Sequence, residues 1–132
     1  HTLEEKSKEY PNSPSGMPGV QTLLPIMLDF VNKNKLSIFD LVRLLCTNPC
    51  NIYKVLNKGR IEIGYDADLT VIDMNKKFRI TNNWIQSKSK WTPYDNVVVK
   101  GMPIFTIVNG QIAMSENEVI PVTQGKKLKF DY

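Results

Sequence analysis

The sequence predicts an α+β fold in which helices come first and strands follow. Apolar residues recur at helical spacing up to residue 57, whereas they alternate with polar residues after Gly59. The two halves are not interleaved, which favours two structural layers or pieces of two domains. We place the boundary at residues 57–60, so that the expected units are residues 1–57 and 58–132.

The first helix is expected over residues 20–32, where apolar side chains repeat at helical spacing. Pro25 lies inside this segment and should kink the helix or delay its start. The polar residues 1–13 have no period and predict a loop. Between them, "PSGMPGV" at residues 14–20 holds two prolines and two glycines, which predict a shaped loop.

Two more helices are expected before the boundary. Ser37 is a good N-cap for a helix over residues 38–46. Asn48 should cap a third, short helix with Pro49 at its first position, ending near residue 56. We expect Asn48 and Pro49 to interrupt the helical path between the cysteines on either side.

The second half contains short alternating segments that are typical of strands. We expect strands over residues 60–63, 67–73, 78–80, 97–99, 104–108 and 111–114. Asn109-Gly110 predicts a type I′ hairpin between the last two. Trp84, Trp91 and Tyr94 fall in an irregular stretch and are interpreted as packing it onto the sheet, with a platform for a sugar or a base as the alternative.

The composition is that of one ordinary globular domain, with 132 residues, 42% apolar and 23% charged. The net charge of +4 is scattered apart from residues 125–130, so nucleic acid is not the expected partner. No apolar run approaches the ~20 residues of a membrane span, and no signal peptide is visible. We therefore expect a cytoplasmic protein with no membrane partner.

The candidate metal ligands and acid-base residues are few. Cys46 and Cys50 are interpreted as free thiols of a reducing compartment, because zinc needs further ligands and His1 is the single histidine. Asp66 and Asp68 would point the same way on a strand, which permits an acid-base pair. Turn or strand-edge capping is favoured for both, since no basic partner lies nearby in sequence.

Three stretches resemble one enzyme family. "HTLEEK" with "PSGMPGVQT" is similar to the segment that follows the last barrel strand in class I dihydroorotases, where a motif Asp-His-Ala-Pro-His ends on the histidine matched by His1. "GRIEIGYDADLTVID" resembles a stretch found across the amidohydrolase superfamily. "SKSKWTPYDN" and "KGMPIFTIVNGQI" resemble the region that follows in dihydroorotases and hydantoinases. The resemblance covers nearly the whole chain.

The resemblance implies the C-terminal part of a larger hydrolase, an incomplete piece of the metal-dependent hydrolase fold. Residues 1–57 would end a TIM-type (β/α)8 barrel, and residues 58–132 would add strands to a small β-sandwich and a tail. In that family two zinc ions activate the water that opens dihydroorotate to N-carbamoyl-aspartate in pyrimidine biosynthesis. Its metal ligands and catalytic aspartate have no match here, so we expect this segment alone to bind no zinc and to be inactive.

The resemblance also implies substrate contacts. His1 would bind the carboxylate of dihydroorotate, and Ser15 and Gly16 would meet the substrate through their backbone. Read from the residues alone, His1 is a solvated residue and the loop is ordinary turn chemistry. The expected partners are the substrate, the rest of the barrel, and a second copy or another enzyme of the pathway. The alternatives are a hydantoinase-like cyclic amidohydrolase and a non-catalytic interaction module.

Overall fold

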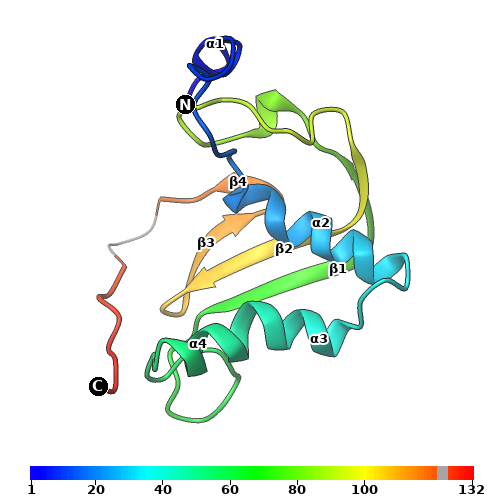
Figure 1. Ribbon diagram of the computed structural model, residues 1–132. Helices are drawn as coiled ribbons and strands as arrows, with labels where there is room; N and C mark the ends of the chain where they lie inside the picture. Colours follow the sequence, from blue (N-terminus) through cyan, green and yellow to red (C-terminus); the bar gives the residue numbers. More distant parts are fainter. Residues whose placement is uncertain (122–124) are drawn as a thin grey trace.

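A four-stranded antiparallel sheet forms the centre of the chain, with helices over one face and along one edge (Figure 1). The computed structural model describes residues 1–121 and 125–132. The strands lie in the order β1 (Leu69–Arg79), β2 (Val98–Val108), β3 (Gln111–Ser115) and β4 (Glu118–Val119). The helical elements are α1 (Leu3–Lys6), α2 (Val20–Asn32), α3 (Ile38–Val42), η1 (Arg43–Thr47), α4 (Asn48–Ile52) and the 3-10 turn η2 (Asn82–Trp84).

Helix α2 has the predicted bounds and packs on β2. Pro25 is buried in the helix, which starts at Val20, so the predicted later start is wrong. Gly101 of β2 permits the close approach of the helix: its φ is +105°, and a Cβ there would lie 2.7 Å from the Cβ of Leu28. The Asn32 side chain adds a polar link, because its Nδ2 donates to the Lys100 carbonyl at 2.8 Å.

The helical path from residue 38 to residue 52 is continuous, which corrects two predictions. Asn48 has helical φ and ψ and does not cap a new helix, and the last helix ends at Ile52. The turn η1 is a π-helix in which the Asn48 N–H donates to the Arg43 carbonyl. Such a wide turn accommodates Pro49, which has no N–H to donate and would crowd the turn before it in a regular helix.

The N-terminal residues are not the continuous loop that was predicted, since α1 forms there. Thr2 and Glu5 make a capping box: the Glu5 N–H donates to Thr2 Oγ1 at 3.2 Å, and the Thr2 N–H donates to Glu5 Oε2 at 2.6 Å. The Thr-x-x-Glu spacing is a known signal for a helix start. The signal is present in the sequence, within a segment of 13 residues that has five charged residues and no apolar period.

Six short strands were predicted and four strands form. The segments 67–73 and 78–80 join in β1 across an irregularity between Asp73 and Lys77, and 97–99 and 104–108 join in β2. Residues 60–63 are not a strand, and Ile61 and Ile63 are 89% and 103% exposed. Within the described ranges no strand pairs with residues 60–63, so their alternating pattern does not form a strand. Strand β4 was not predicted.

The hairpin and the aromatic packing follow the predictions. Asn109 and Gly110 have φ of +50° and +79°, as a type I′ turn requires. The core cluster of Ile80, Val99 and Met102 is packed against by Trp84 and Tyr94 among others. The packing interpretation is confirmed for Trp84 and Tyr94, whereas the buried Trp91 donates its ring N–H to the His1 carbonyl.

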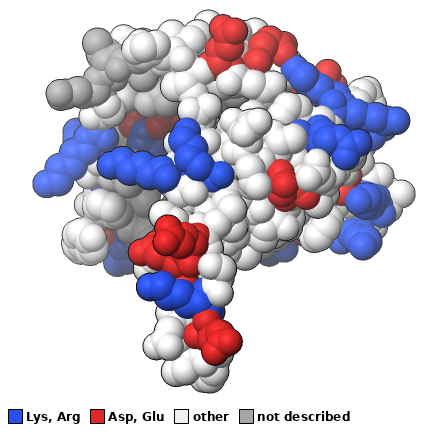
Figure 2. Space-filling model, turned by 90° about the horizontal axis from the view of Figure 1, so that it is seen from above, with Lys and Arg blue, Asp and Glu red and all other residues white. Residues whose placement is uncertain are grey.

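The surface carries charges of both signs. Seen from the top of Figure 1, Lys, Arg, Asp and Glu lie around a broad uncharged area (Figure 2). Large apolar side chains are exposed on the helices, including Val20 at 96%, Phe39 at 84% and Ile52 at 72%. Over the described part of the chain, no helix combines the length and the apolar character that a membrane crossing requires.

Candidate functional site

Three distant parts of the chain enclose a hollow of about 280 Å³ at the end of the molecule that carries α1. They are the first residue, the loop that precedes α2, and the segment of residues 87–91. The lining residues are His1, Ser15, Gly16, Met17, Pro18, Ser87, Ser89 and Trp91. The structure therefore brings together His1, Ser15 and Gly16, the three residues that the sequence singled out.

The loop before α2 is held by α1. Lys6 Nζ donates a hydrogen bond to the Pro14 carbonyl, and Ser13 Oγ donates to the Lys6 carbonyl at 2.9 Å. These bonds fix the start of the loop, and Gly19 then begins α2. Gly16 has a φ of +86°, and a Cβ there would meet nothing within 4 Å. Glycine is thus required there by the backbone conformation, while the space beside it stays open for a ligand.

His1 has one side-chain and one backbone contact. Its Nδ1 lies 3.6 Å from Glu5 Oε2, and its carbonyl accepts a 2.8 Å hydrogen bond from Trp91 Nε1. The hydrogen bond from the Thr2 N–H lowers the pKa of Glu5 below its ordinary value, so this carboxylate is ionised at neutral pH. Any anionic group that binds at the His1 ring would meet Glu5 as a competitor for that ring.

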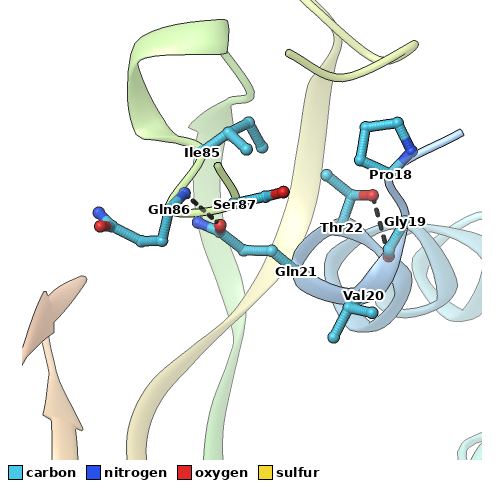
Figure 3. A pocket seen from close by; sticks show the side chains of 8 residues that line it. All are labelled: Pro18, Gly19, Val20, Gln21, Thr22, Ile85, Gln86 and Ser87. Atoms are coloured by element: carbon cyan, nitrogen blue, oxygen red, sulfur yellow. Dashed lines mark hydrogen bonds between the residues drawn. The ribbon is translucent and has the colours of Figure 1, made fainter. Parts of the chain in front are cut away.

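A second, larger hollow of about 460 Å³ lies next to the first and shares Pro18 and Ser87 with it (Figure 3). Gln21 of α2 is one of its lining residues. Its Nε2 donates to the Trp84 carbonyl at 2.9 Å, and its Oε1 accepts from the Gln86 N–H at 2.8 Å. Residues 84–91, called here the wall segment, therefore bound both hollows.

The wall segment is what sequence reasoning missed. Ser87, Ser89 and Trp91 were known only as part of an irregular stretch, and Gln21 only as a helical residue. Their place beside His1 depends on contacts across more than 60 residues of sequence, such as the Gln21–Trp84 and His1–Trp91 bonds. Only the resemblance of "SKSKWTPYDN" to a family stretch pointed to this region.

No metal centre is built by the described residues. Within residues 1–121 and 125–132, no group of three or more His, Cys, Asp or Glu side chains is placed to hold an ion. Cys46 and Cys50 are free thiols. Cys46 is exposed and Cys50 half-buried. Burial, and then the neighbouring Cys50, raise the pKa of the Cys46 thiol, so Cys46 is a thiol rather than a thiolate at neutral pH.

Asp66 and Asp68 have a basic partner, contrary to the prediction. Lys58 Nζ lies 3.0 Å from Asp66 Oδ2 and also contacts Asp68. The hydrogen bond with Asp68 raises the pKa of Lys58, and the same bond, with one from the Asn109 N–H, lowers the pKa of Asp68. Asp68 accepts that Asn109 N–H at 2.7 Å, at the start of the hairpin turn. The predicted capping role is therefore confirmed for Asp68, while the side chain of Asp66 pairs with Lys58.

The sequence profile of the Amidohydrolase family matches residues 15–113, well over half of the 132 residues. The chain belongs to the amidohydrolase family. The matched range includes the loop before α2 from Ser15 onward, all of the wall segment, strands β1 and β2, and the first three residues of β3.

Curated relatives of this amidohydrolase chain are named dihydroorotase. That of Methanosphaera stadtmanae is 43% identical over 119 residues, which are 90% of this chain and 28% of the relative. That of Pyrococcus horikoshii is 40% identical over 128 residues, which are 97% of this chain and 30% of the relative. The chain thus spans less than a third of the length of these relatives.

Solved amidohydrolases share the fold. An L-hydantoinase (dihydropyrimidinase) from Arthrobacter aurescens superposes with a TM-score of 0.77 and 33% identity, over 83% of this chain and 25% of that chain. A D-hydantoinase from Thermus sp. gives a TM-score of 0.85 at 21% identity, over 91% of this chain and 27% of that chain, and supports the fold alone. The predicted α+β fold, as one part of the amidohydrolase fold, is confirmed.

Proposed function

We propose that this chain is the C-terminal part of a dihydroorotase, which reversibly hydrolyses the cyclic amide of dihydroorotate to N-carbamoyl-aspartate. The convergence of His1, Ser15 and Gly16 on one hollow is the observation that carries the proposal. The dihydroorotase names of the relatives, at 43% and 40% identity, support it. We place the enzyme in the cytoplasm, as a step of pyrimidine biosynthesis.

The role proposed for these residues is to bind and orient the substrate. A protonated His1 ring supplies a charge-assisted hydrogen bond to the substrate carboxylate. The backbone at Ser15 and Gly16 lines the opposite part of the hollow, where no side chain of residue 16 blocks a ring. Holding the scissile amide in one orientation is a large part of what such a site contributes to rate.

A binuclear zinc centre does not fit the residues of this chain. The described residues hold no cluster of ligands, and zinc needs several His, Cys or carboxylate ligands at one point. We therefore assign the zinc ligands, and the catalytic residues with them, to the part of the enzyme outside this chain. None of the steps proposed for His1, Ser15 and Gly16 involves metal chemistry.

The proposed division of the chain has residues 1–57 at the end of the barrel and residues 58–132 in the strands of a β-sandwich with a tail. The exposed apolar residues of the helices support it, because Val20, Phe39 and Ile52 leave large apolar surface uncovered. Surface of this kind is normally covered by protein. The proposed cover is the rest of the barrel, with a second copy or a pathway enzyme as a further partner.

The test uses the full-length enzyme from the complete reading frame, with dihydroorotate and dihydrouracil as substrates. Dihydrouracil has the same ring without the carboxylate. His1→Ala is expected to raise KM for dihydroorotate by about ten- to a hundredfold, as loss of a hydrogen bond to a charged group does. Activity on dihydrouracil should stay unchanged. An equal loss on both substrates would show that His1 does not read the carboxylate.

A hydantoinase is the second candidate, favoured by the 33% identity to the L-hydantoinase structure. The same enzyme preparation separates the two. Faster turnover of hydantoins than of dihydroorotate would favour the hydantoinase, and His1 would then have no carboxylate to bind.

A further inference from the structure

Trp91 is the residue of the wall segment that the proposed function leaves without a role. It is 8% exposed and lines the same hollow as His1. Its Nε1 donates a 2.8 Å hydrogen bond to the His1 carbonyl, from 90 positions further along the chain. We propose that Trp91 is a positioning residue, which fixes the backbone of His1 so that its ring meets the substrate carboxylate. This inference rests on the proposed function.

His1 needs such a support. Its side chain is 54% exposed, and its neighbour Glu5 lies 3.6 Å away at an equally exposed site. An exposed ring loses conformational entropy when it binds a ligand, and this loss weakens binding. Because the buried indole holds the backbone of His1, the free ring samples fewer positions. It therefore loses less conformational entropy when a ligand binds. The Trp91 bond therefore favours the bound arrangement before the substrate arrives.

Trp91 is itself firmly placed from both sides. On one side, the Lys90 N–H donates to the Ser87 carbonyl at 3.0 Å, and Lys90 has a φ of +56°. A lysine at positive φ is uncommon and unfavourable, so the surrounding contacts must maintain this turn. On the other side, the buried Thr92 donates its N–H to Asn82 Oδ1 at 2.9 Å.

The wall segment is also hydrogen-bonded to the start of α2, which follows the loop of residues 14–19. Gln21, two residues into α2, donates to the Trp84 carbonyl and accepts from the Gln86 N–H, as Figure 3 shows for the second bond. The segment is thus attached to the start of α2 at one end and to His1 at the other. A rigid wall of this kind sets the distance between the His1 ring and the backbone of Gly16.

The experiment is Trp91→Phe in the full-length enzyme, which removes the ring N–H and keeps an aromatic ring. We expect KM for dihydroorotate to rise about fivefold, as loss of one hydrogen bond does, with kcat within about twofold. Activity on dihydrouracil should not change. Tyr94→Phe is the control: Tyr94 lies outside the wall segment, packs against the core cluster and does not line the hollow, so KM should stay as in the parent.

A second measurement separates positioning from a general structural effect. In an enzyme that already carries His1→Ala, Trp91→Phe should cause no further rise in KM, because the ring that it positions is absent. A further fivefold rise in that background would overturn the inference. If Trp91→Phe does not fold, Asn82→Ala, which removes the hydrogen bond from the Thr92 N–H and keeps the indole, is expected to raise KM for dihydroorotate alone, and an equal effect on dihydrouracil would overturn the inference.

Failure of the inference and failure of the proposed function give different results. If His1→Ala separates the two substrates but Trp91→Phe does not, Trp91 has no positioning role and the proposed function stands. If His1→Ala itself does not separate them, the proposed carboxylate contact is wrong, and the Trp91 assignment falls with it.

Discussion

At the scale of single residues, Lys58 is an ion-pair partner that the residues next to Asp66 and Asp68 in sequence do not reveal. The sequence indicates that Asp66 and Asp68 form a pair, but the residues next to them include no basic side chain. Lys58 contacts both carboxylates across the turn at Gly64. Its side chain is only 19% exposed, and the Asp66 N–H donates to the Asn57 carbonyl at 3.0 Å, which closes the turn and brings the carboxylates to Lys58.

The pH dependence of this cluster has a definite sign. Asp68 has a lowered pKa in the folded protein, so its contribution is present above about pH 3.9, its unfolded value, and is lost as pH falls through the folded value. Lys58 has a raised pKa, so its contribution is present below about pH 10.4 and is lost as pH rises through the folded value. The pair therefore stabilises the fold between these limits.

We predict that Lys58→Met lowers the free energy of unfolding by about 1 kcal/mol at pH 7, discounted for the 34% exposure of Asp68. Urea unfolding of the full-length enzyme at a series of pH values measures this. The difference from the parent should shrink below pH 4. Lys76→Met is the control, since its partner Glu116 is 59% exposed and the loss should be smaller. Equal losses for both variants would contradict the assignment.

At the scale of elements, helix positions were predicted better than strand pairing. Helix α2 has the predicted bounds because its apolar residues and its glycine boundary are all local. Strand bounds were wrong where 97–99 and 104–108 were predicted as separate strands, because β2 runs through Gly101 and Pro103 as one strand. Gly101 is the place where α2 touches the sheet. A residue that interrupts the alternating pattern of the strand therefore permits the contact between helix and sheet.

We predict that Gly101→Ala destabilises the fold by about 2 kcal/mol or more, because a Cβ would lie 2.7 Å from that of Leu28 at a positive φ. Gly110→Ala is the matched control. Its φ of +79° carries a similar backbone penalty, but a Cβ there would meet nothing within 4 Å. The difference in urea midpoint between the two variants measures the helix–sheet contact. If the two midpoints coincide, α2 does not pack on Gly101 as described.

At the scale of the whole molecule, fold class and family were predictable, whereas the hollow was not. Family stretches lie within single elements or their joining loops and are readable from sequence. The hollow depends on the His1–Trp91 bond, whose residues are 90 positions apart, and on the Gln21–Trp84 bond, whose residues are 63 positions apart. No short stretch of sequence encodes such pairs. His1, Ser15 and Gly16 were predicted as substrate contacts because a family stretch marks them, whereas the stretch that contains Trp91 implied no role for its indole beside His1.

We predict that residues 1–132 produced alone associate in solution, because apolar residues such as Val20 and Phe39 are 96% and 84% exposed. Light scattering and binding of an apolar dye measure this, and metal analysis with a dihydroorotate assay is done on the same sample. We expect association, no stoichiometric zinc and no turnover. A monomer that excludes the dye, or one that binds zinc and turns over, would contradict the proposed division of the enzyme.

The bond between the first residue and Trp91 also sets an order of events during synthesis. A ribosome makes Trp91 90 residues after His1, so for most of this interval the nascent chain carries His1 and the loop of residues 14–19 without the wall segment that completes the hollow. Contacts between residues so far apart in sequence form late and slowly. The newly synthesised enzyme should therefore gain its affinity for substrate only after the wall segment has left the ribosome.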